Sequence, residues 1–266
     1  MTKKQSYEWY PSPRYLLRRK LIIRNLRTID CRNKSILEIG YGAGDTLCSY
    51  AALGMKVYGY DFSKIAKKEA SRRLKVNGYT NVTLWNTEDE AYAKTRQYDV
   101  VAACEVLEHI EDDENMLQRW HDLIQRDGYI IITVPSRMKK WCLNDVWAGH
   151  YRRYEKQELR DKLLAAGFEI VNFWSYPFPI NIALDYFLEK EKKREKGIEL
   201  HDEKGFKKED MTKESGVKRE ASALARMFSK DWLLLPWHLL QLLFVNTDLG
   251  SGYVVMAKKV DVYRKN

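Results

Sequence analysis

Apolar and polar positions alternate with two different periods along residues 35–135. Short apolar runs bounded by glycine or charged residues predict strands, and longer segments with apolar residues three or four positions apart predict helices. The predicted strands are Ser35–Ile39, Lys56–Tyr60, Val82–Trp85, Tyr98–Cys104 and Tyr129–Val134. The predicted helices between them are Gly44–Leu53, Lys64–Asn77 and Asp113–Gln125, the last one stopped by Gly128. This alternation is typical of a parallel sheet that is covered by helices on both faces.

The pattern continues downstream with a helix over residues 155–165, a sixth strand over 168–176 and a seventh strand at Gly252–Ala257. About 75 residues separate the sixth and seventh strands, which is much longer than an ordinary connection. Residues 189–220 of this segment mix positive and negative charges, whereas residues 221–245 are apolar. We therefore expect a helical insertion or lid over 181–247, and a core made of 35–180 and 248–260.

Residues 1–34 are predicted to form a basic helical extension. Pro13 and an apolar stripe at helical spacing predict a helix over 13–29. Met1–Ser35 contains ten positive residues against two negative ones, a local balance of +8 within a total of +9. Such a helix either faces water or meets an anionic partner, which would be a phosphate-bearing substrate, a lipid surface or RNA.

The composition narrows the protein class. A chain of 266 residues with 45% hydrophobic and 31% charged residues is neither collagen-like, wholly disordered nor an integral membrane protein. Its four cysteines form no C-x-x-C pair, which argues against a zinc ribbon or a disulfide scaffold and favours reduced thiols in the cytoplasm. The start of the chain has no apolar core of signal-peptide length, and Pro236 interrupts the apolar stretch 232–245. No membrane span is expected.

The strongest local motif is ILEIGYGAGDT, in which a strand runs into glycines at 40, 42 and 44 before a helix. Glycines permit a tight turn there, and the helix N-terminal amides then point at a ligand. Asp61 follows Gly40 by 21 residues at the end of the second strand, where a carboxylate can accept hydrogen bonds from both ribose hydroxyls. The pair predicts a nucleoside cofactor. A dinucleotide fingerprint would need its third glycine at position 45, where Asp45 stands.

The pattern E-x-G-x-G-x-G with the later Asp61 resembles motif I of the class I S-adenosylmethionine-dependent methyltransferases. The resemblance covers about residues 35–176 and extends to YDVVAACEVLEHI, DGYIIITVPS and GHYRRYEKQELRDKLLAAGFEIV. It implies an α/β fold with a Rossmann-like, seven-stranded, mostly parallel sheet, helices on both faces and an antiparallel last strand. It also implies S-adenosyl-L-methionine as the cofactor.

The resemblance assigns expected roles to individual residues. The methionine part of the cofactor would lie in the loop that contains Glu38, Gly40, Tyr41, Gly42 and Gly44. Asp61 would hold the ribose and Phe62 would stack on the adenine, although Asp61 as a helix cap and Phe62 as a core aromatic are the structural alternatives. The residues expected at the adenine edge are Asn86, Thr87 and Glu88, and those expected beside the sulfonium are Cys104 and Glu105.

Methyl transfer to a hydroxyl needs aligned reactants and a group that removes the proton. The predicted catalytic residues are Glu105, His109 and His150. Glu105, Glu108 and His109 stand at i, i+3 and i+4, so one helical turn would bring them to one face, within reach of His150. Three uses stay open: a metal-free base at His109 or His150, a divalent metal site of Glu105, Glu108, His109 and His150, or a structural role. The metal set is similar to that of the small-RNA terminal 2′-O-methyltransferases.

The sequence predicts a methyltransferase that acts on a small-molecule acceptor, at a hydroxyl oxygen, in biosynthesis. Its motifs resemble those of the ubiquinone-pathway O-methyltransferases, and the acceptor would be anionic or lipid-like. Arg152 and Arg153 either clamp an anionic group or form surface salt bridges. The alternatives are a metal-assisted RNA ribose 2′-O-methyltransferase and a non-catalytic scaffold that docks on a membrane or partner. The oligomeric state is left open.

Overall fold

A computed structural model of the chain describes residues 10–93, 97–182 and 231–260. Its seven strands are β1 (Ser35–Ile39), β2 (Lys56–Tyr60), β3 (Val82–Trp85), β4 (Tyr98–Cys104), β5 (Ile124–Pro135), β6 (Phe168–Tyr176) and β7 (Gly252–Lys259). They form one sheet in the order β3-β2-β1-β4-β5-β7-β6. The first five strands pair in parallel, and β7 runs antiparallel to both β5 and β6. The predicted mostly parallel sheet with an antiparallel last strand is confirmed.

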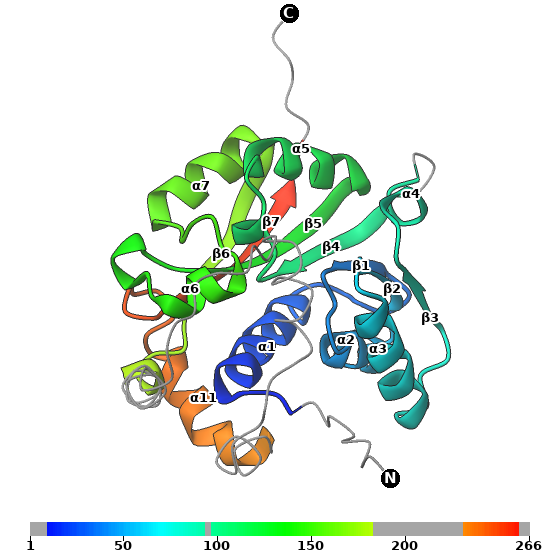
Figure 1. Cartoon of the computed structure of the whole chain (residues 1–266), viewed down its shortest axis with the longest axis horizontal. Coiled ribbons are helices and arrows are strands. Elements are labelled where there is room, and N and C mark those ends of the chain that lie inside the picture. The colour runs from blue at the N-terminus through cyan, green and yellow to red at the C-terminus, as the bar shows by residue number, and fades with distance from the viewer. Residues whose placement is uncertain (1–9, 94–96, 183–230, 261–266) are drawn as a thin grey trace, which may run out of the picture.

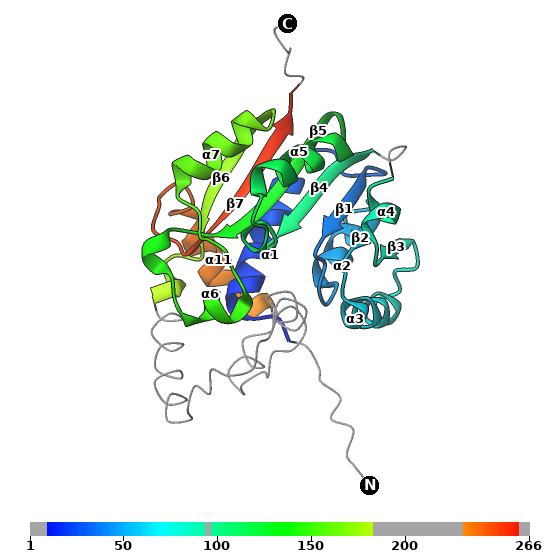
Figure 2. The same ribbon diagram turned by 45° about the horizontal axis from the view of Figure 1, so that its top comes forward.

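Helices cover both faces of this sheet (Figure 1). The α-helices are α1 (Pro13–Leu26), α2 (Asp45–Ala52), α3 (Lys64–Val76), α4 (Glu88–Ala91), α5 (Asp113–Leu123), α6 (Leu143–Ala148), α7 (Lys156–Ala165) and α11 (Leu235–Leu242). Three short 3₁₀ turns are η1 (Leu107–His109), η2 (Met138–Lys140) and η3 (Asp231–Leu234). Figure 2 shows α5 and α7 on one side of the sheet and α1 on the other.

Alternate side chains of each central strand enter two separate cores. In β4, Val101 and Ala103 pack with residues of α5 and α7, whereas Val100 and Ala102 pack with residues of α1, α2 and α3. Because both faces are covered, the strand is apolar at nearly every position, as expected for a buried parallel strand. The carboxyl ends of the parallel strands thereby meet at one edge, where ligands bind in open α/β sheets.

The predicted end of the third helix was wrong by two residues. Helix α5 ends at Leu123, and Ile124 already pairs with Tyr98 of β4. A Cβ on Gly128 would lie 2.8 Å from the carbonyl oxygen of Asp99, so the glycine permits close approach of β5 to β4. The glycine therefore serves the strand pairing and does not itself end the helix.

Helix α1 begins as predicted, with the hydroxyl of Ser12 accepting a hydrogen bond from the backbone N–H of Tyr15. It ends at Leu26, three residues before the predicted end. Leu21, Ile22 and Leu26 are fully buried and share one core with α2 and α3. The apolar face of the basic extension is thus part of the core that it shares with α2 and α3. The domain boundary at residue 34 stays a prediction.

The predicted insertion over 181–247 is described only at its two ends, since residues 183–230 lie outside the described part of the chain. After them, η3 and α11 lie against α1. Leu234 packs on Leu16 and Leu17, and the side-chain amide of Gln241 donates to the carbonyl of Leu17 at 3.3 Å. None of the described helices combines the length and apolarity that crossing a bilayer would require.

Candidate active site

The glycine loop connects β1 to α2 at the carboxyl edge of the sheet. Gly40, Gly42 and Gly44 all have positive φ, which L-residues with a side chain rarely adopt. A Cβ on Gly40 would lie 2.6 Å from Val106, and one on Gly44 would lie 2.6 Å from the Cβ of Ala70. The glycines thus give the loop its left-handed turn and let it pack closely on neighbouring elements.

Asp61 lies directly beyond β2 and faces this loop. Its Oδ2 accepts a hydrogen bond from the backbone N–H of Gly42 at 2.9 Å, and its Oδ1 accepts one from the N–H of Ser63 at 2.8 Å. A carboxylate has about four acceptor positions, so two remain for a diol. The cap of α3 is Ser63, whose hydroxyl accepts from Ala66, and Asp61 is therefore not the helix cap. The geometry fits a ribose.

The residues predicted around the adenine have different environments. Phe62 is 45% exposed, so it is not a core aromatic and its ring is open to stacking. The amide of Asn86 donates to the carbonyls of Asp61 and Ser63 and so fixes the backbone that carries Phe62. Thr87 bonds Glu90, and Glu88 forms an ion pair with Arg119, so both face partners on the protein surface.

Glu38 is a buried carboxyl at the end of β1. The hydroxyl of Thr46 lies 2.6 Å from both carboxylate oxygens. Burial raises the pKa of Glu38 to about 8, against the opposing effects of the Thr46 hydrogen bond and the Arg18 charge. The group is therefore largely uncharged at neutral pH and would become ionised beside a cationic ligand.

Glu105 ends β4 with a left-handed backbone, at φ 58°. Three donors meet at its Oε1: the Arg18 guanidinium at 3.2 Å, the Thr133 hydroxyl at 3.0 Å and the Tyr176 hydroxyl at 3.0 Å. Although burial opposes it, the Arg18 charge and these hydrogen bonds hold the pKa of Glu105 below its usual value. Glu105 is thus a fixed anion, and the next residue, Val106, packs against Gly40 of the glycine loop.

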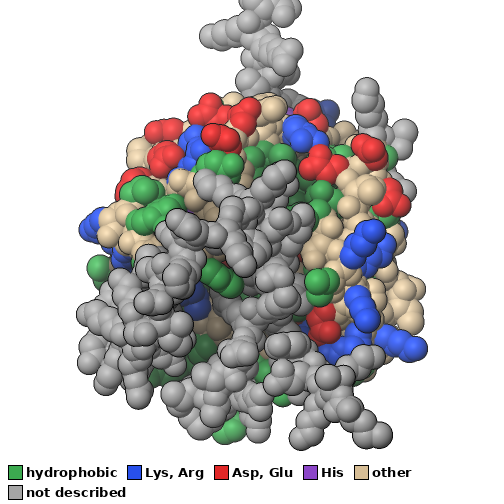
Figure 3. Space-filling model, in the orientation of Figure 1, with side chains coloured by type: hydrophobic (Ala, Val, Ile, Leu, Met, Phe, Trp, Pro, Cys, Tyr) green, Lys and Arg blue, Asp and Glu red, His purple; other side chains and the backbone are tan. Residues whose placement is uncertain are grey.

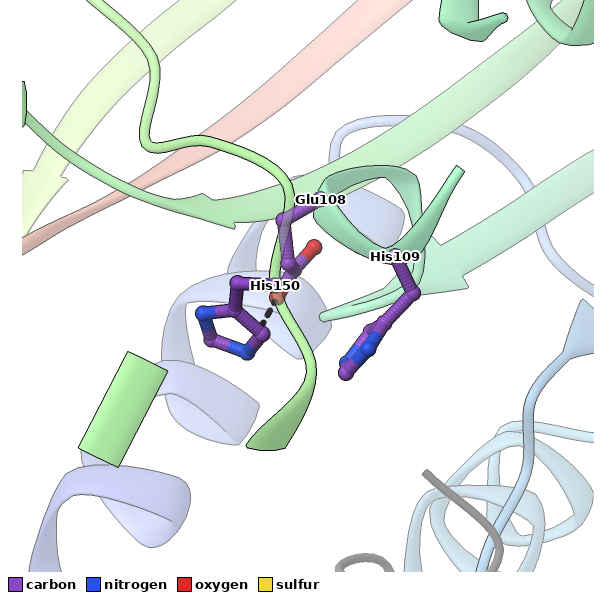
Figure 4. Close-up of side chains that lie close together, drawn as sticks. All are labelled: Glu108, His109 and His150. Atoms are coloured by element: carbon purple, nitrogen blue, oxygen red, sulfur yellow. Dashed lines mark ion pairs between the residues drawn. The ribbon is translucent and has the colours of Figure 1, made fainter. Parts of the chain in front are cut away.

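Glu108, His109 and His150 converge beside it (Figure 4). One ligand atom from each lies within 4.8 Å of the others. Glu108 is fully buried, and neither of its carboxylate oxygens has a hydrogen-bond partner among the described residues. Its Oε1 lies 3.9 Å from Nε2 of His150, and the two imidazole rings lie edge to face with centroids 4.7 Å apart.

The surroundings of Glu108 and His109 disfavour the charged form of each side chain. Burial and the nearby Glu105 raise the pKa of Glu108 well above its ordinary value. Burial, and to a smaller extent the neighbouring His150, lower the pKa of His109 to about 4. Without a bound cation, the arrangement is therefore a protonated acid beside a neutral imidazole.

Glu105 does not join these three residues as the spacing predicted. The i, i+3, i+4 argument assumes one α-helical turn, but Glu105 has a positive φ and only Leu107–His109 form a turn, of the 3₁₀ type. The carboxylate of Glu105 is consequently directed to Arg18 and Tyr176. The structure groups Glu108 and His109 with His150, which comes from the loop after α6.

Sequence reasoning missed two residues of this region. Arg18 belongs to the basic helix, and nothing in its local pattern separates it from neighbours that face water. Asp145 is 1% exposed in α6 and lies 2.9 Å from Nδ1 of His150. Arg153, predicted as an anion clamp, instead binds Asp145 with two hydrogen bonds, and Arg152 pairs with Asp113. Both arginines therefore form salt bridges, which was the alternative to an anion clamp.

These elements match a known family. A family model described as a methyltransferase domain matches residues 13–172, which is more than half of the chain. The chain belongs to the methyltransferase-domain family. The matched range of this methyltransferase domain contains α1, the glycine loop, Asp61 and the Glu108–His109–His150 cluster, and it ends before the insertion and β7.

Curated relatives and solved structures agree with this assignment. The ubiquinone biosynthesis O-methyltransferase of Thiobacillus denitrificans is 28% identical over 148 residues, which are 54% of this chain and 64% of that protein. The protein of the same name from Nitrosomonas europaea is 31% identical over 122 residues, 44% of this chain and 51% of that protein. The methyltransferase domain therefore matches less than two thirds of either relative.

Two structural neighbours show that the fold is shared. A putative sarcosine dimethylglycine methyltransferase from Galdieria sulphuraria superposes with a TM-score of 0.59 at 12% identity, covering 91% of this chain and 85% of that one. The magnesium protoporphyrin IX methyltransferase of Synechocystis, with bound SAH, gives a TM-score of 0.52 at 21% identity over 61% of this chain and 78% of that one. At these identities the likeness concerns the fold alone.

Proposed function

We propose that the protein transfers the methyl group of S-adenosylmethionine to a hydroxyl oxygen of a small-molecule acceptor in a biosynthetic reaction. The observation that carries this proposal is the arrangement of Asp61 and the glycine loop at the carboxyl edge of the sheet. Asp61 keeps acceptor capacity for a ribose while its other bonds fix it to Gly42 and Ser63. The family assignment and the names of the relatives support the same chemistry.

The donor would lie across the loop, with its ribose on Asp61 and its adenine on the exposed ring of Phe62. Its methionine part would lie along Gly40–Gly44, close to Glu38. A cationic amino or sulfonium group next to Glu38 would favour the ionised carboxylate, which burial alone disfavours. Buried Cys104 and the fixed Glu105 would then border the reacting methyl.

The acceptor hydroxyl would lose its proton to His150 while its oxygen attacks the methyl carbon. The C–O bond forms as the C–S bond breaks, and the electron pair of that bond stays on sulfur as the thioether product. His109 would lie beside the acceptor as an uncharged side chain, because its lowered pKa keeps the imidazole neutral. Alignment of the two reactants supplies most of the rate in such a displacement.

A divalent cation is the second candidate for activating the hydroxyl, and the unpartnered carboxylate of Glu108 favours it. A buried oxygen pair beside two imidazoles is a donor set that suits zinc or manganese, with positions left open for a hydroxyl. Glu108, His109 and His150 would hold the ion, which would lower the pKa of the bound hydroxyl. Metal analysis of the purified protein and activity after chelation test this alternative; bound metal together with lost activity would favour it over a metal-free base.

We propose a lipid-like acceptor, and the names of the relatives, which are O-methyltransferases of ubiquinone biosynthesis, are consistent with this proposal. The described part of the insertion presents an apolar face to solvent, made of Trp232, Leu235, Leu239 and Leu243. Burial lowers the pKa of His238 on α11 to about 4, and the nearby charges of Lys20 and Arg24 on α1 act in the same direction. Exposed apolar residues beside cations suit contact with an anionic membrane surface, from which a lipid-like acceptor would enter.

The ion pairs of the N-terminal helix weaken the argument for the RNA alternative. Arg18 and Arg19 were counted toward its positive charge, but they pair with Glu105 and Asp45 inside the protein. Figure 3 shows basic side chains over α3 and acidic ones over the rim formed by α5 and α7. RNA binding that weakens with salt, together with methyl transfer to RNA, would restore this alternative.

The decisive experiment measures donor binding and methyl transfer together. We expect S-adenosylhomocysteine to bind the intact chain by titration calorimetry and NAD not to bind. Asp61→Ala should weaken the binding at least tenfold, whereas Glu169→Gln on the exposed side of β6 should leave it unchanged. Radiolabelled donor should then label a catechol that carries a short prenyl chain. If S-adenosylhomocysteine does not bind at millimolar concentration, the proposed function is wrong.

A further inference from the structure

Asp145 is a buried carboxylate that lies beside the candidate site. It is 1% exposed and accepts four hydrogen bonds or close polar contacts. Oδ1 faces Nε of Arg153 at 2.9 Å and Nδ1 of His150 at 2.9 Å. Oδ2 accepts from Nη2 of Arg153 and from the backbone N–H of Cys142, both at 2.8 Å. The carboxylate is thus surrounded by donors.

These donors decide which nitrogen of His150 carries the proton. Arg153 pairs with both oxygens of Asp145 through Nε and Nη2, a fork-like geometry that suits a carboxylate anion. An ionised carboxylate can only accept hydrogen bonds, so Nδ1 of His150 is the donor in this contact. Nε2 of His150 faces the cluster instead and lies 3.9 Å from Oε1 of Glu108.

The backbone strengthens this arrangement. The N–H of His150 donates to the carbonyl of Asp145 at 2.9 Å, and Gly149 between them has φ 75°. The N–H of Tyr151 donates to the carbonyl of Glu108 at 2.8 Å, which ties the same loop to η1. The imidazole is therefore fixed at Nδ1 and along its backbone, while Nε2 faces the cluster.

We propose that Asp145 is a positioning residue that holds His150 in the Nδ1–H tautomer and presents Nε2 to the acceptor hydroxyl. This inference rests on the proposed function, in which His150 takes the acceptor proton. The proton would move from the hydroxyl oxygen to Nε2, and the resulting imidazolium would be stabilised by the Asp145 carboxylate. Asp145 itself stays ionised and touches neither reactant.

Long-range ¹H–¹⁵N NMR of the intact chain tests the positioning directly, because it reports which ring nitrogen of His150 is protonated. We expect the Nδ1–H form in the native protein and a mixed or inverted form in Asp145→Asn, whose amide can donate to Nδ1. Arg153→Lys keeps a cation beside Asp145 and should retain the native tautomer. A native His150 with its proton on Nε2 would overturn the proposal.

Kinetics with the prenylated catechol separate positioning from a purely structural effect. Asp145→Asn should lower kcat at least tenfold and leave the KM for the donor within about twofold. In a His150→Gln background the same substitution should cost no further activity, because Asp145 acts through His150. An equal loss in both backgrounds would contradict the proposal. If the native protein binds no donor and transfers no methyl group, the proposed function fails, and the NMR result alone decides the positioning of His150.

Discussion

Single residues at the carboxyl edge of the sheet carry unusual protonation states. Glu38 is buried with a pKa near 8, and Glu108 is buried with no hydrogen-bond partner for either oxygen in the described part of the chain. Asp61 also has a raised pKa because it is buried, although the backbone N–H groups of Ser63 and Gly42 partly oppose this. Perturbed carboxyls of this kind gather at functional sites because a ligand, and not the fold, supplies their missing partners.

Glu38 makes the stability of the ligand-free protein depend on pH. The unfolded chain releases this proton near 4.5 and the folded chain only near 8, so the folded state binds more protons in between. The contribution of Glu38 is therefore fully present below pH 4.5 and is lost as the pH rises towards 8. In Glu38→Gln, we expect the free energy of unfolding, measured in urea, to fall by roughly 2–4 kcal/mol less over this pH range than in the native protein. Glu169→Gln, at an exposed site, should follow the native profile, and an unchanged decline in Glu38→Gln would contradict the assignment.

Gly44 combines a positive φ with a crowded site, and Gly78 separates the two effects. Both have φ 76°, but a Cβ on Gly78 would meet nothing within 4 Å, whereas one on Gly44 would meet Ala70 at 2.6 Å. We expect Gly78→Ala to cost about 1–2 kcal/mol from the backbone alone. Gly44→Ala should cost about 1–3 kcal/mol more through overpacking, and it should also weaken S-adenosylhomocysteine binding. Equal losses of stability in the two variants would show that α3 does not constrain the loop.

Among the elements, α1 links the N-terminal segment to the site. Its apolar face is part of the core that it shares with α2 and α3. Arg18 pairs with Glu105 after β4, and Arg19 pairs with Asp45 at the start of α2. Arg73 of α3 also lies 3.5 Å from Asp45. Three helices are thus connected by charge next to the glycine loop, and the family match includes the whole of α1 from Pro13.

Removal of Arg18 should expose this connection. Arg18→Met leaves Glu105 without its cation, and we expect a loss of about 2–3 kcal/mol in the free energy of unfolding. The double variant Arg18→Met with Glu105→Gln should recover at least half of that loss, because no uncompensated charge remains. A double-mutant cycle by urea unfolding measures this coupling, and a coupling energy of zero would show that the ion pair does not contribute.

At the scale of the whole molecule, the sheet brings the proposed donor and acceptor sites together at one edge, and the segment from η3 to the end of α11 has an exposed apolar face. That face is exposed at Trp232, Leu235, Leu239 and Leu243, the last one by 75%. The opposite side of the same segment is buried against α1 through Leu234 and Gln241. The two sides of the segment therefore differ clearly in their surroundings.

The proposed membrane contact predicts binding to anionic vesicles. We expect flotation of the intact chain with vesicles of phosphatidylglycerol and phosphatidylcholine, weaker binding to phosphatidylcholine alone and release by salt. The double variant Trp232→Ser with Leu243→Ser should reduce binding at least fivefold. Leu164→Ser on α7, where Leu164 is 52% exposed, serves as the matched control. Equal binding by the control and the double variant would exclude this face as the contact.

The order and type of the strands and of the longer helices, the glycine loop and Asp61 follow from the sequence by itself, whereas the short helices α4 and α6 were not predicted. Periodicity and glycine placement are local properties, and strands buried on both faces leave a strong apolar signal. The tertiary structure alone decided that Arg18 faces Glu105, that Asp145 contacts His150, and that Glu105 bonds Arg18 and Tyr176 while Glu108 and His109 group with His150. Arg18 and Glu105 are distant in sequence, and the direction of the Glu105 side chain depends on one backbone angle. Asp145 and His150 are only five residues apart, but their contact requires the left-handed turn at Gly149, which the periodicity of the sequence does not reveal.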